Sequence, residues 1–176
     1  MPGSYKAEAI VLKRTNLGEA DRLVTVFSKH SGKLVLLAKG IRRLTSRKKG
    51  HLELFNRVKL QVANGKNLDI VTEAETINNF SNLRRNLNRV RIAYLLLELV
   101  DKLTAENQEH REVYALLCEN LSQLNGNSAS NNLIADFETQ LLTWLGFGLP
   151  NHHDRASLEA HILTIIEKPL NSKKLK

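Results

Sequence analysis

Residues 22–38, RLVTVFSKHSGKLVLLA, decide the fold class of this chain. Residues 22–28 alternate between two sets of apolar and β-branched side chains, and residues 34–38 are wholly aliphatic. The turn-forming residues His30, Ser31 and Gly32 lie between the two runs. A period of two with this composition is typical of β-strands. The segment therefore predicts two neighbouring strands, Arg22–Ser28 and Lys33–Ala38.

Three more strands are predicted on either side of this pair. Tyr5–Arg14 is β-rich and is followed by a turn at Asn16-Leu17-Gly18. Leu52–Ala63 and Asn67–Thr72 flank Asn64-Gly65, which is a strong hairpin signal. Five short strands favour a small closed sheet, since a two-layer sandwich normally has more strands. A five-stranded barrel of the oligonucleotide-binding (OB) type fits, and an SH3-like barrel stays open as an alternative.

The second half of the chain predicts helices. Apolar residues recur at helical spacing in Asn88–Leu103, Glu109–Asn125 and Leu133–Leu145. A last helix is expected to begin after Asp154 as N-cap and to end at Pro169. We therefore expect an α+β chain, with an N-terminal OB-type barrel over residues 1–80 and an α-helical bundle over residues 81–176.

One apolar stripe in the helical half has two interpretations. Leu133, Phe137, Leu141 and Trp144 lie on one face of the predicted helix over residues 133–145. A small bundle needs its apolar side chains for its core, so core is the favoured interpretation. A groove for a partner peptide is the alternative.

A run of basic residues follows the third predicted strand. Between Ala38 and Gly50 no carboxylate interrupts six cations, which are Lys39, Arg42, Arg43, Arg47, Lys48 and Lys49. Residues 1–80 hold 15 Lys and Arg against 7 Asp and Glu, whereas residues 81–176 hold 11 of each. Such a segment repels itself unless a polyanion lies against it, and a nucleic-acid backbone is the best candidate. A solvated surface loop is the alternative.

Other residues of the basic half bear on the same hypothesis. Five further cations extend the patch if the strand register places them on its face: Lys13, Arg14, Arg22, Lys29 and Lys33. Aromatic residues that could stack on bases are few, namely Tyr5, Phe27, Phe55 and Phe80, and the core is the better place for Phe27 and Phe55. This scarcity favours sequence-tolerant binding through the nucleic-acid backbone.

Several function classes are disfavoured. The motifs of serine hydrolases, P-loop nucleotidases and zinc peptidases are absent, so we expect no enzyme and no cofactor. The histidines at 152, 153 and 161 are better explained as polar surface residues than as metal ligands, and the single Cys118 rules out a cysteine-based zinc ribbon. The longest apolar run, Ile92–Leu97, is too short to cross a membrane, and no signal peptide is evident. A cytoplasmic protein is expected.

The order of several motifs resembles a known family. Glu8–Leu12, Gly18–Thr25 (GEADRLVT), Gly32-Lys33 and Ala38–Arg43 (AKG-x-RR) resemble the N-terminal half of the bacterial DNA repair protein family RecO. Further segments continue the resemblance over nearly the whole chain: Leu52–Phe55, Thr72–Glu75, Tyr94–Leu99, Leu142–Gly146 and Pro169–Lys174.

The resemblance implies a function that composition alone does not give. RecO proteins combine an OB barrel with a helical domain, bind single- and double-stranded DNA and anneal complementary strands without consuming nucleotide. With RecR they load a recombinase onto DNA coated by single-strand-binding protein (SSB), whose acidic, apolar C-terminal tail docks on the helical domain. By position, the basic residues 39–49 would face the DNA. An RNA-binding OB protein, a protein adaptor and a nuclease are the competing hypotheses.

The chain departs from the family pattern at one place. Many RecO proteins carry a four-cysteine zinc module after the helix that would end here near Gly148, but in this sequence Pro150 is followed almost at once by Asp154. No zinc is therefore expected, and activities that depend on that module are in doubt.

Overall fold

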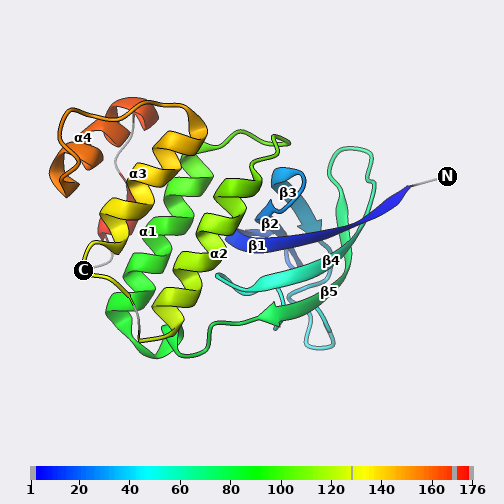
Figure 1. Ribbon diagram of the computed structural model, residues 1–176. Helices are drawn as coiled ribbons and strands as arrows, with labels where there is room; N and C mark the ends of the chain where they lie inside the picture. The colour runs from blue at the N-terminus through cyan, green and yellow to red at the C-terminus, as the bar shows by residue number, and fades with distance from the viewer. Residues whose placement is uncertain (1–2, 128, 168–169, 175–176) are drawn as a thin grey trace. The chain divides into compact units, whose positions relative to one another are not determined.

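Five strands lead into four α-helices in the computed structural model, which describes residues 3–127, 129–167 and 170–174 (Figure 1). The strands are β1 (Ser4–Leu17), β2 (Asp21–Ser28), β3 (Gly32–Ala38), β4 (Arg57–Ala63) and β5 (Ile70–Asn78). The helices are α1 (Leu87–Leu103), α2 (Arg111–Asn125), α3 (Leu133–Leu145) and α4 (Arg155–Ile166). Short 3₁₀ turns lie at Leu83–Arg85 (η1) and Asn171–Lys174 (η2).

The strands close into a barrel in the order β1-β2-β3-β5-β4, and β4 pairs back with β1. All neighbours are antiparallel except β3 and β5, which meet in parallel at Leu37 and Ile70. The Leu37 N–H donates to the Asp69 carbonyl at 2.8 Å beside that contact. This order is that of an OB-type barrel, which settles the choice against the SH3-like alternative.

Four predicted strand boundaries were wrong by three residues or more. β1 continues to Leu17, and the turn starts at Gly18, whose φ of 57° suits glycine. β4 starts at Arg57 rather than Leu52, because the backbone before it turns back on itself with Phe55 at φ 73°. β5 begins at Ile70 rather than Asn67 and continues through residues 73–78, beyond its predicted end at Thr72. That stretch alternates exposed glutamates with a half-buried alanine, so it is a strand with one solvated face.

Strand alternation fills the barrel with aliphatic side chains. In β3, Leu34, Leu36 and Ala38 are buried, whereas the residues between them are half-buried. The core cluster adds side chains from the other strands and from the loop after β3: Ala9, Val11, Val24, Val26, Ile41, Leu52, Val58, Leu60, Val62 and Val71. Two of these, Ile41 and Leu52, come from outside the strands, which matters for the site below.

The β4–β5 hairpin predicted at Asn64-Gly65 is present, with a longer connection than a two-residue turn. The last ladder pair is Ala63 with Ile70, so residues 64–69 form the loop. A Cβ on Gly65 would lie 1.8 Å from the Leu68 carbonyl oxygen, so only glycine fits there. The Asp69 carboxylate accepts a hydrogen bond from the Gly65 N–H at 3.1 Å, which fixes the loop locally.

The chain divides into two compact units. The barrel unit contains the residues up to Asn79 together with Glu106–Arg111, and the helical unit contains Phe80–Ala105 and the residues from Glu112 onward. The Glu106–Arg111 segment is bound to the barrel through the Asn107 N–H, which donates to the Lys33 carbonyl at 2.9 Å. It also passes so close to Gly32 that a Cβ there would lie 1.7 Å from the Gln108 oxygen. Gly32 (φ 64°) is therefore required by conformation and by space.

The predicted helices are confirmed, with small shifts at their ends. The Asp154 carboxylate caps α4 by accepting from the Ser157 N–H at 3.1 Å, and Gly146 ends α3 in the left-handed conformation. α2 begins at Arg111 rather than Glu109. Pro169, expected to end α4, lies outside the described residues, and α4 already ends at Ile166.

The interior of the helical unit is mainly apolar, although Asn120 and Glu138 are also buried. Buried residues line all four helices, among them Leu96 of α1, Leu117 of α2, Phe137 of α3 and Ile162 of α4. Leu133, Phe137 and Leu141 confirm the predicted core stripe, but Trp144 is 54% exposed and does not belong to it.

Residues near the C-terminal end are fixed to α1 through Glu98. Its carboxylate accepts from the N–H groups of Asn171 at 2.6 Å and Ser172 at 2.8 Å, and from Lys102 at 3.2 Å. Burial acts to raise the pKa of Glu98, but these hydrogen bonds outweigh it and hold the pKa below its ordinary value.

Candidate nucleic-acid interface

The loop between β3 and β4, residues 39–56, carries the basic segment, and its backbone is anchored to the barrel. Ile41 and Leu52 are fully buried in the barrel core. Two tight turns, in which Arg43 N–H donates to Gly40 and Ser46 N–H donates to Arg43, fold the intervening chain. A loop held at two buried points presents its remaining side chains from a fixed base.

Hydrogen bonds fix the start of this loop to the β1–β2 turn. The Gly40 N–H donates to the Asp21 carboxylate at 2.7 Å. Arg42 donates from its backbone N–H to the Ala20 carbonyl and from its guanidinium to the Gly18 carbonyl, both at 2.9 Å. The Arg42 side chain is exposed. One of its N–H donors is used in the bond to the Gly18 carbonyl, and the other donors remain for an anion.

The sequence placed Lys48 among the residues expected to face DNA, but its contacts in the structure are with the protein's own backbone. Its ammonium donates to the backbone carbonyls of Lys39 at 3.2 Å and Val71 at 3.0 Å. Burial lowers the pKa of Lys48, while the negative charge of Asp21 acts in the opposite direction. Lys48 therefore joins the loop to β5, and its charge is mainly committed to the protein's own carbonyls.

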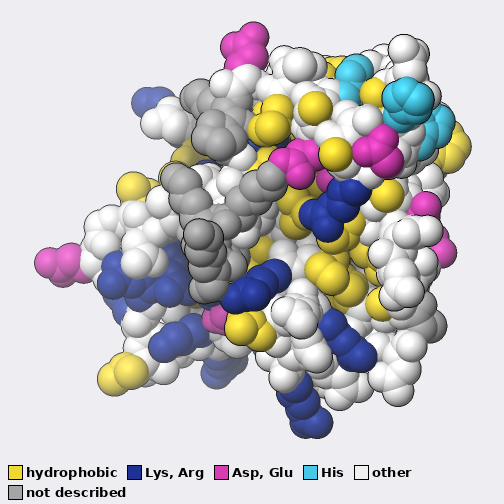
Figure 2. Space-filling view, turned by 90° about the vertical axis from the view of Figure 1, so that its left-hand side faces the viewer, with side chains coloured by type: hydrophobic (Ala, Val, Ile, Leu, Met, Phe, Trp, Pro, Cys, Tyr) yellow, Lys and Arg dark blue, Asp and Glu magenta, His cyan; other side chains and the backbone are white. Residues whose placement is uncertain are grey.

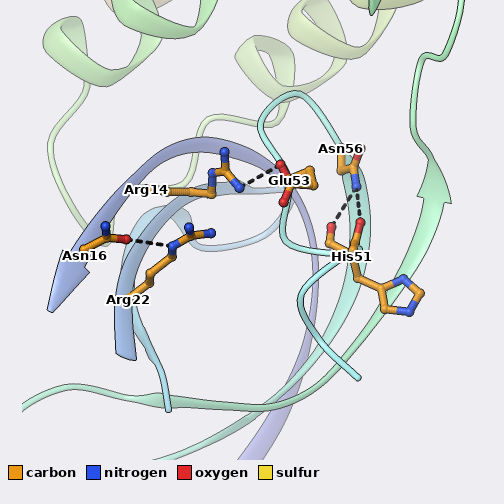
Figure 3. Close-up of polar contacts among 7 residues, drawn as sticks. Arg14, Asn16, Arg22, His51, Glu53 and Asn56 are labelled. Carbon is orange, nitrogen blue, oxygen red and sulfur yellow. Dashed lines mark hydrogen bonds and ion pairs between the residues drawn. The ribbon is translucent and has the colours of Figure 1, made fainter. Parts of the chain in front are cut away.

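His51 and Asn56 hold the return of the loop, and the sequence did not single them out. The Thr76 N–H donates to His51 Nδ1 at 3.1 Å, and Thr76 Oγ1 lies 2.9 Å from the same nitrogen. Nδ1 is therefore the acceptor in the neutral ring. The buried Asn56 amide donates to the carbonyls of His51 at 2.8 Å and Gly50 at 3.3 Å (Figure 3).

Four of the six predicted loop cations are free within the described part of the chain. They are exposed, and their side chains make no hydrogen bond or ion pair with any described residue: Lys39, Arg43, Arg47 and Lys49. Cationic groups without internal partners, on a loop with a fixed base, are suited to contact phosphate groups. We call these four residues the free cations.

The cations predicted to extend the patch differ in their partners and in their distance from the β3–β4 loop. Arg14 forms an ion pair with Glu53 at 2.7 Å, and Arg22 donates to the Asn16 amide oxygen at 2.8 Å (Figure 3). Arg22 pairs in register with Ala38, so it lies beside the start of the β3–β4 loop, and the exposed Lys13 lies farther along β1.

Lys33 lies at the other end of β3, and Lys29 lies in the turn that precedes this strand. At roughly 3.3 Å per residue, six residues of strand separate Lys33 from Lys39 by about 20 Å. The register therefore brings Arg22 toward the loop and leaves Lys29 and Lys33 away from it.

The aromatic residues of the basic half are engaged elsewhere. Phe27, Phe55 and Phe80 are buried, which confirms the core assignment of Phe27 and Phe55. Tyr5 donates to the Asp69 carboxylate at 2.9 Å, and burial together with that bond raises its pKa to about 12. None of these four residues is an exposed platform for stacking bases.

The described residues include no group of three or more His, Cys, Asp and Glu side chains placed to hold a metal ion. Within the same described ranges, no helix is both long and apolar enough to cross a membrane.

Comparison with known proteins identifies the family. Residues 1–80 match the family described as Recombination protein O N terminal, and residues 84–160 match Recombination protein O C terminal. The chain belongs to the RecO family. The barrel matches the N-terminal model, as the GEADRLVT and AKG-x-RR blocks indicated, and the match to the C-terminal model covers α1, α2, α3 and the first part of α4.

Curated RecO relatives support the same assignment. A DNA repair protein RecO from Roseiflexus sp. (strain RS-1) is 40% identical over 143 residues, which is 81% of this chain and 50% of the relative. The namesake from Synechococcus elongatus is 36% identical over 155 residues, covering 87% of this chain and 58% of the relative. The chain spans about half the length of the curated relatives it matches.

Proposed function

We propose that this RecO chain is a non-enzymatic recombination mediator. It binds single- and double-stranded DNA, anneals complementary strands and, with a RecR-like mediator, helps to load a recombinase on DNA coated by SSB. The observation that carries the DNA-binding part is the set of free cations, Lys39, Arg43, Arg47 and Lys49, on a loop whose base is anchored in the barrel. Family membership supports the role in repair.

The proposed mechanism is electrostatic. Two complementary strands repel each other through their phosphates, and annealing requires that this repulsion be reduced. Cations that contact phosphates release condensed counterions, which favours binding at low salt without selecting a base sequence. Four contacts to a single strand give a slope of about −2.8 for log K against log salt concentration. None of the four aromatic residues of the basic half is an exposed platform for bases, which also supports binding through the nucleic-acid backbone.

A matched pair of variants tests this proposal. The first replaces the free cations by alanine, and the control replaces four other exposed lysines of the barrel unit, Lys6, Lys29, Lys59 and Lys66. Both variants lose the same charge. We expect the first to flatten the salt slope by about 2.8 and to weaken binding roughly 100-fold near 0.2 M salt, and the control to change the slope much less.

The readouts are fluorescence anisotropy across a salt series and an annealing assay on SSB-coated strands. Equal effects of the two variants would show that total charge matters and that the loop does not. Tighter binding to RNA than to DNA of the same sequence would favour the RNA-binding hypothesis, and Mg²⁺-dependent cleavage of labelled DNA would favour a nuclease.

We further propose that a groove in the helical unit binds the C-terminal tail of SSB. A cavity of about 340 Å³ lies between α1, α3, α4 and the residues near the C-terminus. Apolar and cationic side chains share its lining, namely Ile92, Leu95, Ile134, Leu170, Arg91 and Arg155. Figure 2 shows one face of the molecule, on which hydrophobic side chains lie among Lys or Arg and Asp or Glu side chains. An acidic, apolar peptide matches this combination.

The charge distribution in this groove sets the orientation of the peptide. Glu138 and Glu159 also line it and would repel a carboxylate, so the acidic end must enter beside the arginines. The Nε of Arg91 is buried and has no hydrogen-bond partner among the described residues, so this arginine keeps an unused donor beside the groove. We expect Arg155→Ala to weaken binding of an SSB-tail peptide about tenfold, whereas Arg85→Ala, which removes an exposed arginine outside the groove, leaves it unchanged.

A further inference from the structure

One aliphatic side chain projects from the middle of the cationic loop. Leu44 is 99% exposed and follows Arg43 in the turn closed by the hydrogen bond from the Ser46 N–H to the Arg43 carbonyl. Its position is therefore at the apex of a turn, with the free cations Arg43 and Arg47 on either side along the chain. Isolated exposed leucines are common on protein surfaces, so the exposure gains meaning only from these surroundings.

A second exposed leucine lies at the same end of the barrel. Leu17 is 44% exposed at the end of β1, and the next residue, Gly18, accepts the hydrogen bond from the Arg42 guanidinium. Arg42 thus joins the β1–β2 turn, which directly follows Leu17, to the loop that carries Leu44. The cationic end of the barrel therefore presents aliphatic groups together with its positive charges.

DNA offers both kinds of surface without an unstacking cost only where its bases are unpaired, since opening one step of an intact duplex costs about a few kcal/mol. Phosphates satisfy the cations along any DNA, but in an intact duplex the apolar faces of the bases are stacked on one another. In a single strand those faces are accessible, and aliphatic side chains can contact or insert between them. The aromatics of the basic half are buried or engaged, so Leu44 is the side chain best placed for this contact.

We propose that Leu44, assisted by Leu17, contacts unstacked bases and makes the loop favour single-stranded DNA over intact duplex. The inference rests on the proposed DNA binding by the free cations. It adds a non-electrostatic contribution to that binding. An apolar contact releases no counterions, so its loss changes the affinity by the same factor at every salt concentration.

The test compares Leu44→Ser with Leu68→Ser in the full chain. Leu68, which is 37% exposed in the β4–β5 loop, is the control for loss of an exposed leucine. We expect Leu44→Ser to weaken binding of a mixed-sequence single strand roughly fivefold across the salt series with an unchanged slope. Its effect on a blunt duplex should stay below about twofold, and Leu68→Ser should alter neither. Leu44→Trp should strengthen single-strand binding, because indole stacks on any base.

The outcomes separate this inference from the proposed function. If the wild-type chain binds neither single strand nor duplex, the proposed function is wrong. If it binds and Leu44→Ser is indistinguishable from Leu68→Ser, or weakens duplex and single strand equally, the inference about bases is wrong while DNA binding stands. Thermal unfolding of each variant verifies that the fold is retained.

Discussion

The β3–β4 loop contains two sets of residues that share the same amino-acid types and differ in what surrounds them. Leu52 is fully buried in the barrel core, whereas Leu44 is 99% exposed. Lys48 donates to two backbone carbonyls, whereas its neighbour Lys49 has no partner among the described residues. The anchored set fixes the loop and the exposed set remains available to a ligand. Composition alone therefore overstates the number of cations in the loop that are free of internal partners.

The leucine pair gives the largest expected difference. Leu52→Ala should lower the free energy of unfolding by about 2–5 kcal/mol, because it leaves a cavity in the barrel core. Leu44→Ala should change it by less than about 0.5 kcal/mol. Urea unfolding followed by circular dichroism measures both. Similar losses for the two variants would contradict the anchored arrangement of the loop.

The lysine pair separates anchoring from ligand binding. Lys48→Met removes the donor shared by the Lys39 and Val71 carbonyls and should cost about 1 kcal/mol of stability, since water can reach part of the site. Lys49→Met should leave stability unchanged and flatten the salt slope for single-stranded DNA by about 0.7. The opposite pattern, with the larger slope change in Lys48→Met, would reassign Lys48 to the DNA-facing set.

The lowered pKa of Lys48 adds a pH dependence to this comparison. In the unfolded chain the side chain returns to an ordinary lysine pKa near 10.4, above its value in the folded protein. Between the two values the unfolded state binds more protons, so the contribution of Lys48 to stability rises with pH in that window. The stability difference between wild type and Lys48→Met should therefore widen in favour of wild type as the pH approaches about 10.

The Arg14–Glu53 ion pair gives the smallest expected effect. Both side chains are partly exposed, so Glu53→Gln should cost at most about 1 kcal/mol of stability. It should also release Arg14 for phosphates and steepen the single-strand salt slope by up to about 0.7. Anisotropy titrations in parallel with Arg14→Ala measure this change. A slope that Glu53→Gln leaves unaltered would mean that Arg14 lies outside the DNA-binding surface.

Local patterns were sufficient to predict much of the fold. Period-two alternation located β2 and β3, the helical spacing of apolar residues located α3, and the N-cap Asp154 located the start of α4, because these signals act within a few residues. β5 was predicted to end at Thr72, because the polar Glu73 and Glu75 interrupt the apolar pattern, although they occupy the solvated face of the strand. The start of β4 was misplaced because Leu52 and Phe55 are apolar without belonging to the sheet.

The candidate site was only partly predictable, since it depends on contacts between distant residues. The basic composition marked the loop, but it did not distinguish Lys48, whose carbonyl partners include Val71. The support from His51 and Asn56 was also missed, because its partners are backbone groups and Thr76, which no sequence motif marks. Strand register was needed to place Arg22 near the loop and Lys33 away from it.

The Glu106–Arg111 segment has a consequence for how the protein is made. It belongs to the barrel unit, yet it is synthesised after α1. During synthesis, β3 can therefore contact Asn107 and Gln108 only after α1 has been synthesised. A fragment that stops at Asn79 lacks this segment permanently. Domain-swap or truncation designs should carry the barrel through Arg111, or supply the segment as a separate peptide and monitor whether it restores the native melting temperature.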